Sequence, residues 1–399
     1  MKIASEADYT KYMLVDVLVT VPDIQREVTL IDSFQEDAKW TLQSAVGSKT
    51  VDETNTEDTQ SIKLTGEVAF MRNKDINISL VDKTGLEISF FVHDLEATSK
   101  VVMYLSGSTS MTATAYRNLA NTDLKQGWNK IAFSLDSMTK NAGFDMSAPV
   151  LAIQLRIEPV TGKEVSVSFD SISTVKANHA NILFTMDDGW ISQYDDNYHI
   201  LKSREMRGNV GLIKNKVDAI GYISKEKFNE MYDDFWDLFN HTSTHPDLST
   251  LTKEEITTEL QDCYDWLVAN NFGRAGKTVA FPQGKYSTVL LETLAELGYV
   301  WARSLINGID LGNQKNNYLA KTYNLVPTIT ATNAVNMVDE AIAVGGTLTF
   351  LTHKLVPESE LTTDTMYWGT ERYNTLADKV KSEMDAGRVC VPTVSEISK

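Results

Sequence analysis

Apolar and polar side chains alternate with a period of two through much of the first half of the chain. In Gln154-Leu155-Arg156-Ile157, for example, every second side chain is apolar. This alternation is typical of antiparallel strands that bury one face. The strands that it predicts are Ser61–Leu64, Ile76–Val81, Leu86–Val92, Lys100–Leu105, Lys130–Ser134, Val150–Glu158 and Val165–Phe169. Because turn residues rather than helices separate these short strands, we expect residues 31–175 to form an all-β sandwich.

The pattern changes after Asn178, where strand-like runs alternate with stretches whose apolar residues recur at helical spacing. The predicted strands are Ile182–Thr185, Asn209–Leu212, Thr278–Phe281, Val300–Ala302 and Thr347–Thr352. The predicted helices are Lys253–Asn270, Thr288–Leu297, Ala334–Ala343 and Glu371–Ala386. Alternating strands and helices indicate a parallel sheet or an α/β barrel. We therefore expect a second domain over residues 181–399, after a polar connector at 176–180.

Composition and charge narrow the classes of partner. The 399 residues are 42% hydrophobic and 23% charged, which is enough to build two globular cores. A formal net charge of -17 repels nucleic acids and anionic lipid surfaces, so we expect neither as a partner. Near the N-terminus, the apolar stretch Leu14–Val21 is short and contains Asp16, so it predicts neither a membrane span nor a signal peptide. Residues 1–30 remain as a separate N-terminal segment that can serve for attachment.

Two adjacent acidic residues follow a predicted strand in the motif Phe184-Thr185-Met186-Asp187-Asp188-Gly189-Trp190. In α/β barrels the carboxyl ends of the strands carry the catalytic groups. An Asp pair before Gly also suits a simple turn. Taken alone, this motif favours the turn.

Two histidines four positions apart, in His241-Thr242-Ser243-Thr244-His245, change that balance. On a helical turn their imidazoles would point the same way and reach one ion. With Asp188 they supply one carboxylate and two imidazoles, the ligand set expected for a hydrolytic zinc or a similar divalent cation. In the alternative reading, the two histidines only cap Asn240 and the loop that follows.

In this order the two motifs resemble those of the polysaccharide deacetylases with a NodB homology domain, carbohydrate esterase family 4. The resemblance implies an α/β fold of the distorted (β/α)7 barrel type. It also implies that Asp187 is the general base, and that Asp188, His241 and His245 bind a divalent metal, with Zn2+ as the expected ion. In this family a metal-activated water attacks the acetyl group.

Two further stretches match the family in the same order, so that the resemblance extends over residues 182–395. Ala280-Phe281-Pro282-Gln283-Gly284-Lys285-Tyr286 looks like the Pro-containing third motif. The backbone N–H of Gln283 is then expected to stabilise the oxyanion. Leu351-Thr352-His353 looks like the last motif, which makes His353 the general acid. The residues expected to line the substrate cleft are Trp190, Pro282, Gly284, Tyr286, Arg303 and Leu351.

The sequence departs from the family at the residue that orients the base. The common third motif begins with an Arg, and the corresponding stretch here, Thr278-Val279-Ala280, has none. We expect Arg303 to replace it, because a cation near Asp187 would keep that carboxylate ionised. The common Asp-Trp fourth motif is not evident between residues 301 and 310.

The two ends of the predicted sandwich also resemble those of a known type of module. It opens with Ile31-Asp32-Ser33-Phe34 and closes with Phe169-Asp170-Ser171-Ile172. This pairing is similar to the first and last strands of jelly-roll modules that accompany carbohydrate-active enzymes. Four aromatic residues offer faces for sugar stacking or, alternatively, fill the core: Trp40, Tyr104, Tyr116 and Trp128.

We therefore expect a hydrolase that removes acetyl groups from an acetylated polysaccharide of a cell surface, capsule or cell wall. An amidase that acts on a small molecule is one alternative, and a catalytically inactive glycan-binding protein is the other. The expected location is extracellular or on a virion, where residues 1–30 would attach a phage tail component that modifies a host capsule. A secreted enzyme that had lost its signal peptide would have the same sequence features.

Overall fold

The computed structural model describes residues 2–3, 13–14 and 25–399 of the chain. Most of the N-terminal segment 1–30, and with it the expected attachment site, therefore lies outside the described residues. The described pieces include β1 (Lys2–Ile3) and β2 (Met13–Leu14), which pair antiparallel. Within the described part of the chain, no helix combines the length and apolar character needed to cross a membrane.

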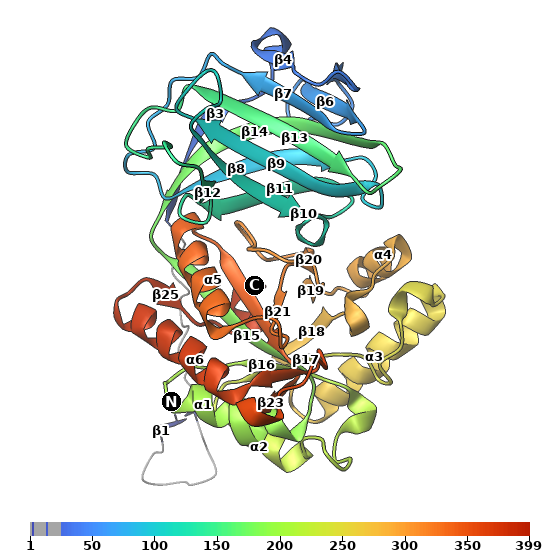
Figure 1. Ribbon diagram of the computed structural model, residues 1–399. Coiled ribbons are helices and arrows are strands. Elements are labelled where there is room, and N and C mark those ends of the chain that lie inside the picture. The colour runs from blue at the N-terminus through green and yellow to red at the C-terminus, as the bar shows by residue number, and fades with distance from the viewer. Residues whose placement is uncertain (1, 4–12, 15–24) are drawn as a thin grey trace.

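Residues 26–177, here called the two-sheet region, form two antiparallel sheets that share one core (Figure 1). The first sheet has the order β12 (Thr139–Lys140), β10 (Thr114–Ala120), β9 (Thr98–Ser106), β13 (Ala152–Pro159), β7 (Ala69–Asn73) and β4 (Trp40–Leu42). The second has the order β11 (Gly127–Ser134), β8 (Gly85–Val92), β14 (Val165–Ala177), β6 (Ser61–Gly66) and β5 (Gly47–Asp52), with β3 (Arg26–Asp32) beside β14.

Side-chain alternation builds this core as the sequence predicts. Leu86, Ile88 and Phe90 of β8 are buried and meet Met103 and Leu155 of the opposite sheet. The strand predicted at Ile76–Val81 is wrong. Only Ile78 makes a bridge there, to Val150, because the rest of the segment has no strand beside it.

The remaining residues, 180–399, form the parallel-sheet region. Its sheet has the order β20 (Asn317–Ala320), β19 (Trp301–Arg303), β18 (Ala275–Ala280), β17 (Asp237–Asn240), β16 (Asn209–Leu212), β15 (Ala180–Asp188), β22 (Thr347–Thr352) and β21 (Tyr323–Asn324), with β25 (Val389–Cys390) also beside β15. A separate pair consists of β23 (Lys354–Val356) and β24 (Tyr367–Gly369). All strand pairs here are parallel, and the sheet fits the predicted (β/α)7-type barrel, with an opening between β20 and β21.

Helices cover the outside of this parallel sheet (Figure 1). They are α1 (His199–Lys202), α2 (Lys225–Asp233), α3 (Lys253–Ala269), α4 (Thr288–Glu296), α5 (Ala331–Val344), α6 (Thr370–Asp385) and α7 (Val394–Ile397). Helix α3 starts at a capping box in which Thr252 and Glu255 bond each other's backbone N–H groups. Its buried face presents Ile256, Leu260, Cys263 and Leu267, whereas Val268 is exposed.

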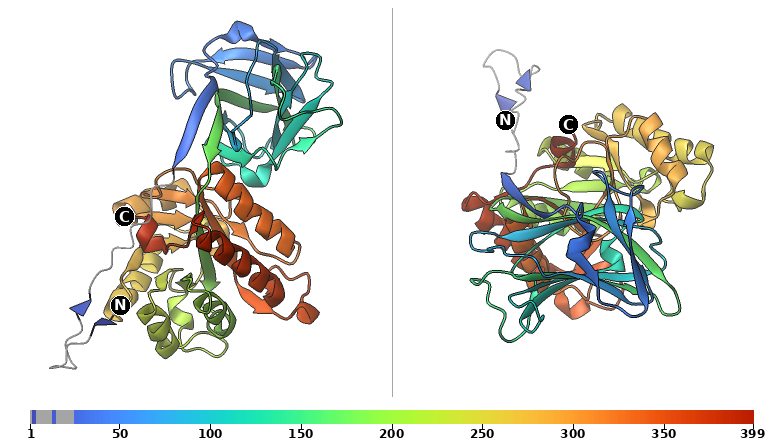
Figure 2. Two further views of the ribbon diagram at one scale, coloured as in Figure 1. Left: turned by 90° about the vertical axis from the view of Figure 1, so that its left-hand side faces the viewer. Right: turned by 90° about the horizontal axis from the view of Figure 1, so that it is seen from above.

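The two regions meet at the C-terminal end of α5, which packs against β8, β11 and β14 (Figure 2). The last carbonyl groups of a helix lack partners inside the helix. Here the Arg26 Nε donates to the carbonyl of Val344 at 3.0 Å, and the Thr84 hydroxyl donates to that of Ala343 at 2.6 Å. The two-sheet region thus donates hydrogen bonds to terminal carbonyl groups of α5 that have no partner within the helix.

Candidate active site

Strand alternation places the expected catalytic groups on the inner face of the curled sheet. In β15, Ile182, Phe184 and Met186 point outward into the core under the helices. The intervening positions therefore point inward, and the last of them is Asp187, at the carboxyl end of the strand. By the same alternation Arg303 ends β19 on the inner face, and His241 follows β17.

Asp188 does not continue this alternation. Its φ of 76° and that of Gly189, 79°, are left-handed, so the strand ends and the chain turns. Oδ1 of Asp188 then lies 3.5 Å from Nε2 of His241 and 3.5 Å from Nε2 of His245. One ligand atom from each of these three residues falls within 4.8 Å of the others. The structure therefore brings together the three ligands that the sequence suggests.

The predicted helical turn between the two histidines is wrong. Residues 241–246 form a loop in which Thr242 and His245 have left-handed φ values of 70° and 68°, and the two rings still lie 4.8 Å apart. Helix α3 holds this loop, since Glu259 accepts hydrogen bonds from the backbone N–H of Ser243 and of Thr244.

The surroundings of the three residues fit a divalent cation. Nδ1 of His241 lies 2.9 Å from the carbonyl oxygen of Ala280, which assigns the ring proton to Nδ1 and leaves the Nε2 lone pair facing Asp188. The Trp190 indole donates to Oδ2 of Asp188 at 2.9 Å, which leaves Oδ1 on the side of the histidines. Such outer contacts orient the ligands of protein-bound zinc.

The pKa shifts of Asp188 and His245 favour a metal at this position, whereas that of His241 opposes it. Burial lowers the pKa of His245, and the neighbouring His241 lowers it further, so the ring is neutral as a ligand must be. Burial alone would raise the pKa of Asp188, but the hydrogen bond and charge of His241 outweigh it and keep the carboxylate ionised. Burial likewise lowers the pKa of His241, and here Asp187 and Asp188 prevail and raise it. A cation would therefore compete with a proton for Nε2 of His241.

Asp187 has a different partner from Asp188. Arg303, which is 1% exposed, donates from Nη2 to Oδ1 of Asp187 at 2.6 Å and also contacts Oδ2. Burial raises the pKa of Asp187, but the Arg303 charge, followed by that of His241, brings it below its ordinary value. The structure thus places Arg303 where the family's missing Arg would be needed, although it comes from the next strand along the sheet.

His353 follows β22 and lies near both aspartates. Burial lowers its pKa, while the charges of Asp187 and Asp188 act in the opposite direction. Among the described residues, its buried Nδ1 has no hydrogen-bond partner. Gln193 donates to the backbone carbonyls of both Asp187 and His353, the latter at 2.8 Å, and so ties the two segments together. No sequence signal pointed to Gln193, because it lies in a short π-helix (Gln193–Tyr198) outside the motifs.

The third motif forms a tight turn after β18. Gln283 has a left-handed φ of 57° in this turn. Pro282 is buried beside it, and a Cβ on Gly284 would come within 2.4 Å of Leu305, so only glycine fits there. Tyr286 packs beside Phe281 with its ring tilted by 34°, in the small cluster under α4. The turn adjoins the metal ligands through Ala280, and the oxyanion role of Gln283 remains a prediction.

An aromatic stack stands beside Asp188. The rings of Trp190 and Tyr222 are 4.3 Å apart and nearly parallel, and Nζ of Lys354 lies 3.6 Å from the Trp190 ring centre. Both faces of the Trp190 ring are thus covered. Leu351, the other residue expected in the apolar wall of the cleft, is buried on β22. Sequence reasoning named Trp190 and Leu351 but missed Tyr222 and Lys354, whose contacts depend on how distant loops pack.

Comparisons with known proteins agree on one family. Residues 174–302, which contain both the Asp187-Asp188 motif and the histidine pair, match the sequence profile described as polysaccharide deacetylase. This part of the chain is therefore similar to the polysaccharide deacetylases, which are hydrolases. The matched part ends just before Arg303 and does not include His353.

The individual proteins that match the chain share low sequence identity with it. The Bacillus subtilis (strain 168) protein YxkH, named for polysaccharide deacetylase activity, is 26% identical over 142 residues, which are 36% of this chain and 50% of YxkH. The chain thus spans about half the length of this curated relative. Among solved structures, the Streptococcus pyogenes deacetylase PplD with acetate has a TM-score of 0.36 and 23% identity, over 39% of this chain and 69% of PplD. A family 4 carbohydrate esterase from Streptomyces lividans with acetate has a TM-score of 0.38 and 14% identity, over 55% and 95% of the two chains.

Zinc binding can be tested without any substrate. We expect Zn2+ added to chelator-treated protein to raise its melting temperature, since a ligand present at a hundred times its Kd stabilises the folded state by about 2.7 kcal/mol. His245→Ala should abolish the rise, because the half-buried His245 ring contributes one of three ligands. The control is His199→Ala, which removes an exposed imidazole outside the site. An equal zinc response in His245→Ala and the unmodified protein would contradict the assignment.

Proposed function

We propose that the chain is a metal-dependent deacetylase that hydrolyses the acetyl groups of a polysaccharide. One observation carries the proposal: Asp188, His241 and His245 converge within 4.8 Å, next to a second carboxylate, Asp187, that Arg303 holds ionised. A binding surface for sugars would need neither a ligand set for a cation nor a paired base beside it. The match of residues 174–302 to the polysaccharide deacetylase profile supports the proposal.

Each residue then has one task in the reaction. A divalent cation at Asp188, His241 and His245, with Zn2+ as the best match to these ligands, would polarise the acetyl carbonyl and make water more acidic. Asp187 accepts the proton of the water whose oxygen attacks the carbonyl carbon. The backbone N–H of Gln283 donates to the oxygen on which negative charge develops.

His353 completes the reaction as the general acid. Its resting ring is neutral because burial lowers its pKa, so it takes a proton from solvent before it donates one, and Asp187 returns the proton of the attacking water to solvent at the end of the cycle. The nearby carboxylates of Asp187 and Asp188 favour the charged ring once that proton arrives. His353 then protonates the leaving nitrogen or oxygen as its bond to the acetyl carbon breaks. Acetate and a sugar with a free amine or hydroxyl are released.

The presence of the two-sheet region favours a polymer over a small molecule as the substrate. We propose that it is a jelly-roll-like sandwich that binds carbohydrate, and that it keeps a long chain close to the catalytic site. The Trp190 ring beside Asp188 can meet the acetylated sugar with its edge, because Tyr222 and Lys354 cover its two faces. A surface or wall polysaccharide places the enzyme outside the producing cell or on a virion, and the attachment through residues 1–30 is part of this proposal.

Acetate release from a glycan panel tests the proposal. The panel contains chitin oligomers, peptidoglycan, acetylated xylan and bacterial capsular polysaccharides, with N-acetylglucosamine and a small aryl acetamide for comparison. We expect one polymer to give the highest kcat/KM. A small-molecule amidase would instead hydrolyse the acetamide as fast as any polymer. Polymer binding without acetate release, in zinc-loaded protein, would favour the inactive glycan-binding alternative.

A further inference from the structure

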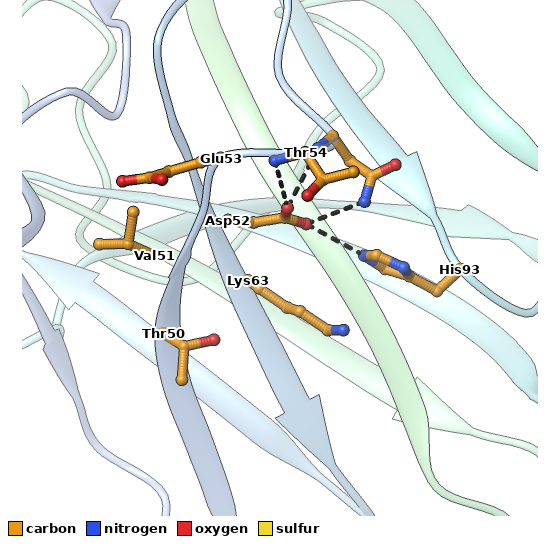
Figure 3. Close-up of a pocket in the computed structure, with 8 residues that line it drawn as sticks. Thr50, Val51, Asp52, Glu53, Thr54, Lys63 and His93 are labelled. Carbon is orange, nitrogen blue, oxygen red and sulfur yellow. Dashed lines mark hydrogen bonds and ion pairs between the residues drawn. The ribbon is translucent and has the colours of Figure 1, made fainter.

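A polar hollow lies on the two-sheet region. It has a volume of about 590 Å³ and opens on the outer face of the sheet that contains β5, β6 and β8 (Figure 3). The residues that line it are Thr50, Val51, Asp52, Glu53, Thr54, Asn55, Lys63 and His93. His93, which lines the hollow, follows one end of β8. Gly85, at the other end of this strand, faces α5 of the parallel-sheet region, so the hollow lies roughly 26 Å along the strand from that contact.

The centre of the hollow is a framework built on the buried Asp52. Its Oδ1 accepts hydrogen bonds from the backbone N–H of Thr54 and of Asn55, both at 3.0 Å. Its Oδ2 accepts from Nδ2 of Asn55 at 3.1 Å and from the Ser168 hydroxyl at 2.6 Å. Because both oxygens are already engaged, Asp52 holds the hollow in shape and is not itself available to a ligand.

This framework fixes the state of His93. The Ser168 hydroxyl gives its proton to Asp52, so it can only accept from Nε2 of His93, which lies 2.8 Å away. Nε2 therefore carries the ring proton, and Nδ1 is left as an acceptor with no hydrogen bond to any described residue. A lone pair with a fixed direction is thus presented beside the hollow.

Lys63 supplies the complementary donor. Its side chain lines the hollow next to His93 (Figure 3), and it makes no hydrogen bond or ion pair with any other described residue. The Glu53 carboxylate points away from it in the same view. A fixed acceptor and a free donor side by side match neighbouring hydroxyl groups, each of which can donate and accept.

An aromatic pair lies on the same face of the sheet, in line with Lys63. Strand register aligns Thr50, Lys63, Ser168, Phe91 and Trp128 in one row over five neighbouring strands. The Phe91 and Trp128 rings are half-buried and 5.6 Å apart. At about 4.8 Å per strand, the row extends for roughly 19 Å, the scale of an oligosaccharide rather than of one small molecule. Its polar end suits hydroxyl groups, and its aromatic end suits the C–H face of a sugar ring.

We propose that this row, from the hollow at Lys63 and His93 to the pair Phe91 and Trp128, binds the polysaccharide at a distance from the catalytic site. The proposal rests on the proposed function for the identity of the polymer, and it goes beyond it by assigning the binding face. Lys63 and His93 bind hydroxyl groups of one part of the chain. Trp128 stacks on a sugar ring farther along.

The test compares two faces of the same region, in an Asp187→Asn background so that the glycan stays acetylated. The test variant is Lys63→Met/His93→Ala, which leaves Asp52 and its partners Thr54 and Asn55 in place. The matched control is Tyr104→Ala/Tyr116→Ala, which removes the half-exposed aromatic pair from the outer face of the other sheet. Binding of peptidoglycan, acetylated xylan and chitin oligomers is measured by sedimentation or affinity electrophoresis. A melting curve verifies that each variant folds.

We expect the test variant to bind the responding polymer at least about tenfold more weakly, and the control to bind it normally. With Asp187 restored, the same substitutions should raise KM for the polymer and leave kcat unchanged. Trp128→Ala, a second test away from the hollow, should weaken binding in the same direction. Loss of binding in the tyrosine control alone would overturn the assignment, as would unchanged binding in both test variants. Because binding is measured without turnover, failure of this proposal differs from failure of the deacetylase, which would appear as absent acetate release.

Discussion

Asp187→Asn is expected to lower kcat/KM for acetate release by about 10²- to 10⁴-fold, the usual contribution of a general base, while zinc binding persists. The reason lies in how the two adjacent carboxylates are used. Asp188 faces both histidines at 3.5 Å, whereas Asp187 is bound by Arg303 and lies outside the cluster of ligand atoms. Asn has nearly the same shape as Asp but cannot take a proton from water.

Asp188→Asn is the matched control for this experiment. It makes the same chemical change one residue later, at a position that contributes a metal ligand, so zinc binding and activity should fall together. Calorimetric titration with Zn2+ and acetate release are measured on both variants. If Asp187→Asn loses zinc to the same extent as Asp188→Asn, the division of labour between the two carboxylates is wrong.

Arg303→Met should destabilise the metal-free protein by about 3–5 kcal/mol, because it leaves the buried Asp187 carboxylate without its cation. The effect depends on pH with a definite sign. Burial raises the pKa of Asp187, but Arg303 and His241 together lower it below the unfolded value, so ionised Asp187 stabilises the fold above about pH 4. The difference in unfolding free energy between the two proteins should therefore be largest near neutral pH and shrink as the pH falls.

Activity provides a second readout of the same pair. Without Arg303 the pKa of Asp187 rises, so the acidic limb of the kcat/KM profile should move to higher pH. Arg303→Lys is the control, since it keeps the charge but loses the planar guanidinium, and its profile should lie between the other two. Denaturant unfolding and pH–rate profiles are the measurements. An unshifted acidic limb in Arg303→Met would mean that Arg303 only fills space.

The parts of the fold set by side-chain periodicity could be predicted from the sequence. The inward alternation of β8 and the helix over Lys253–Ala269 both appear where the pattern predicts them. Periodicity failed at Ile76–Val81, where an apolar run has no neighbouring strand to pair with. Sheet order and the opening between β20 and β21 depend on contacts between distant segments, which no local pattern records.

At the site, the sequence identified candidate residues by their types and short spacing, but it did not predict the backbone conformation that brings them together. The sequence suggested a helical turn between His241 and His245, whereas left-handed angles at Thr242 and His245 bring the rings together. Arg303 was named because the family's Arg is missing from the third motif and a cation near Asp187 would keep that carboxylate ionised. Gln193 was missed because its role comes from two backbone carbonyls rather than from a side chain that the sequence reveals.

Zinc titration of acetate release tests the central claim most directly. The chelated protein is supplied with increasing Zn2+, and acetate is measured from the polymer that responds in the panel. We predict no release without metal, a rise to a plateau at one equivalent of zinc per chain, and no release at any zinc level from His245→Ala. Acetate release by the chelated protein at the full rate would contradict a metal-dependent deacetylase.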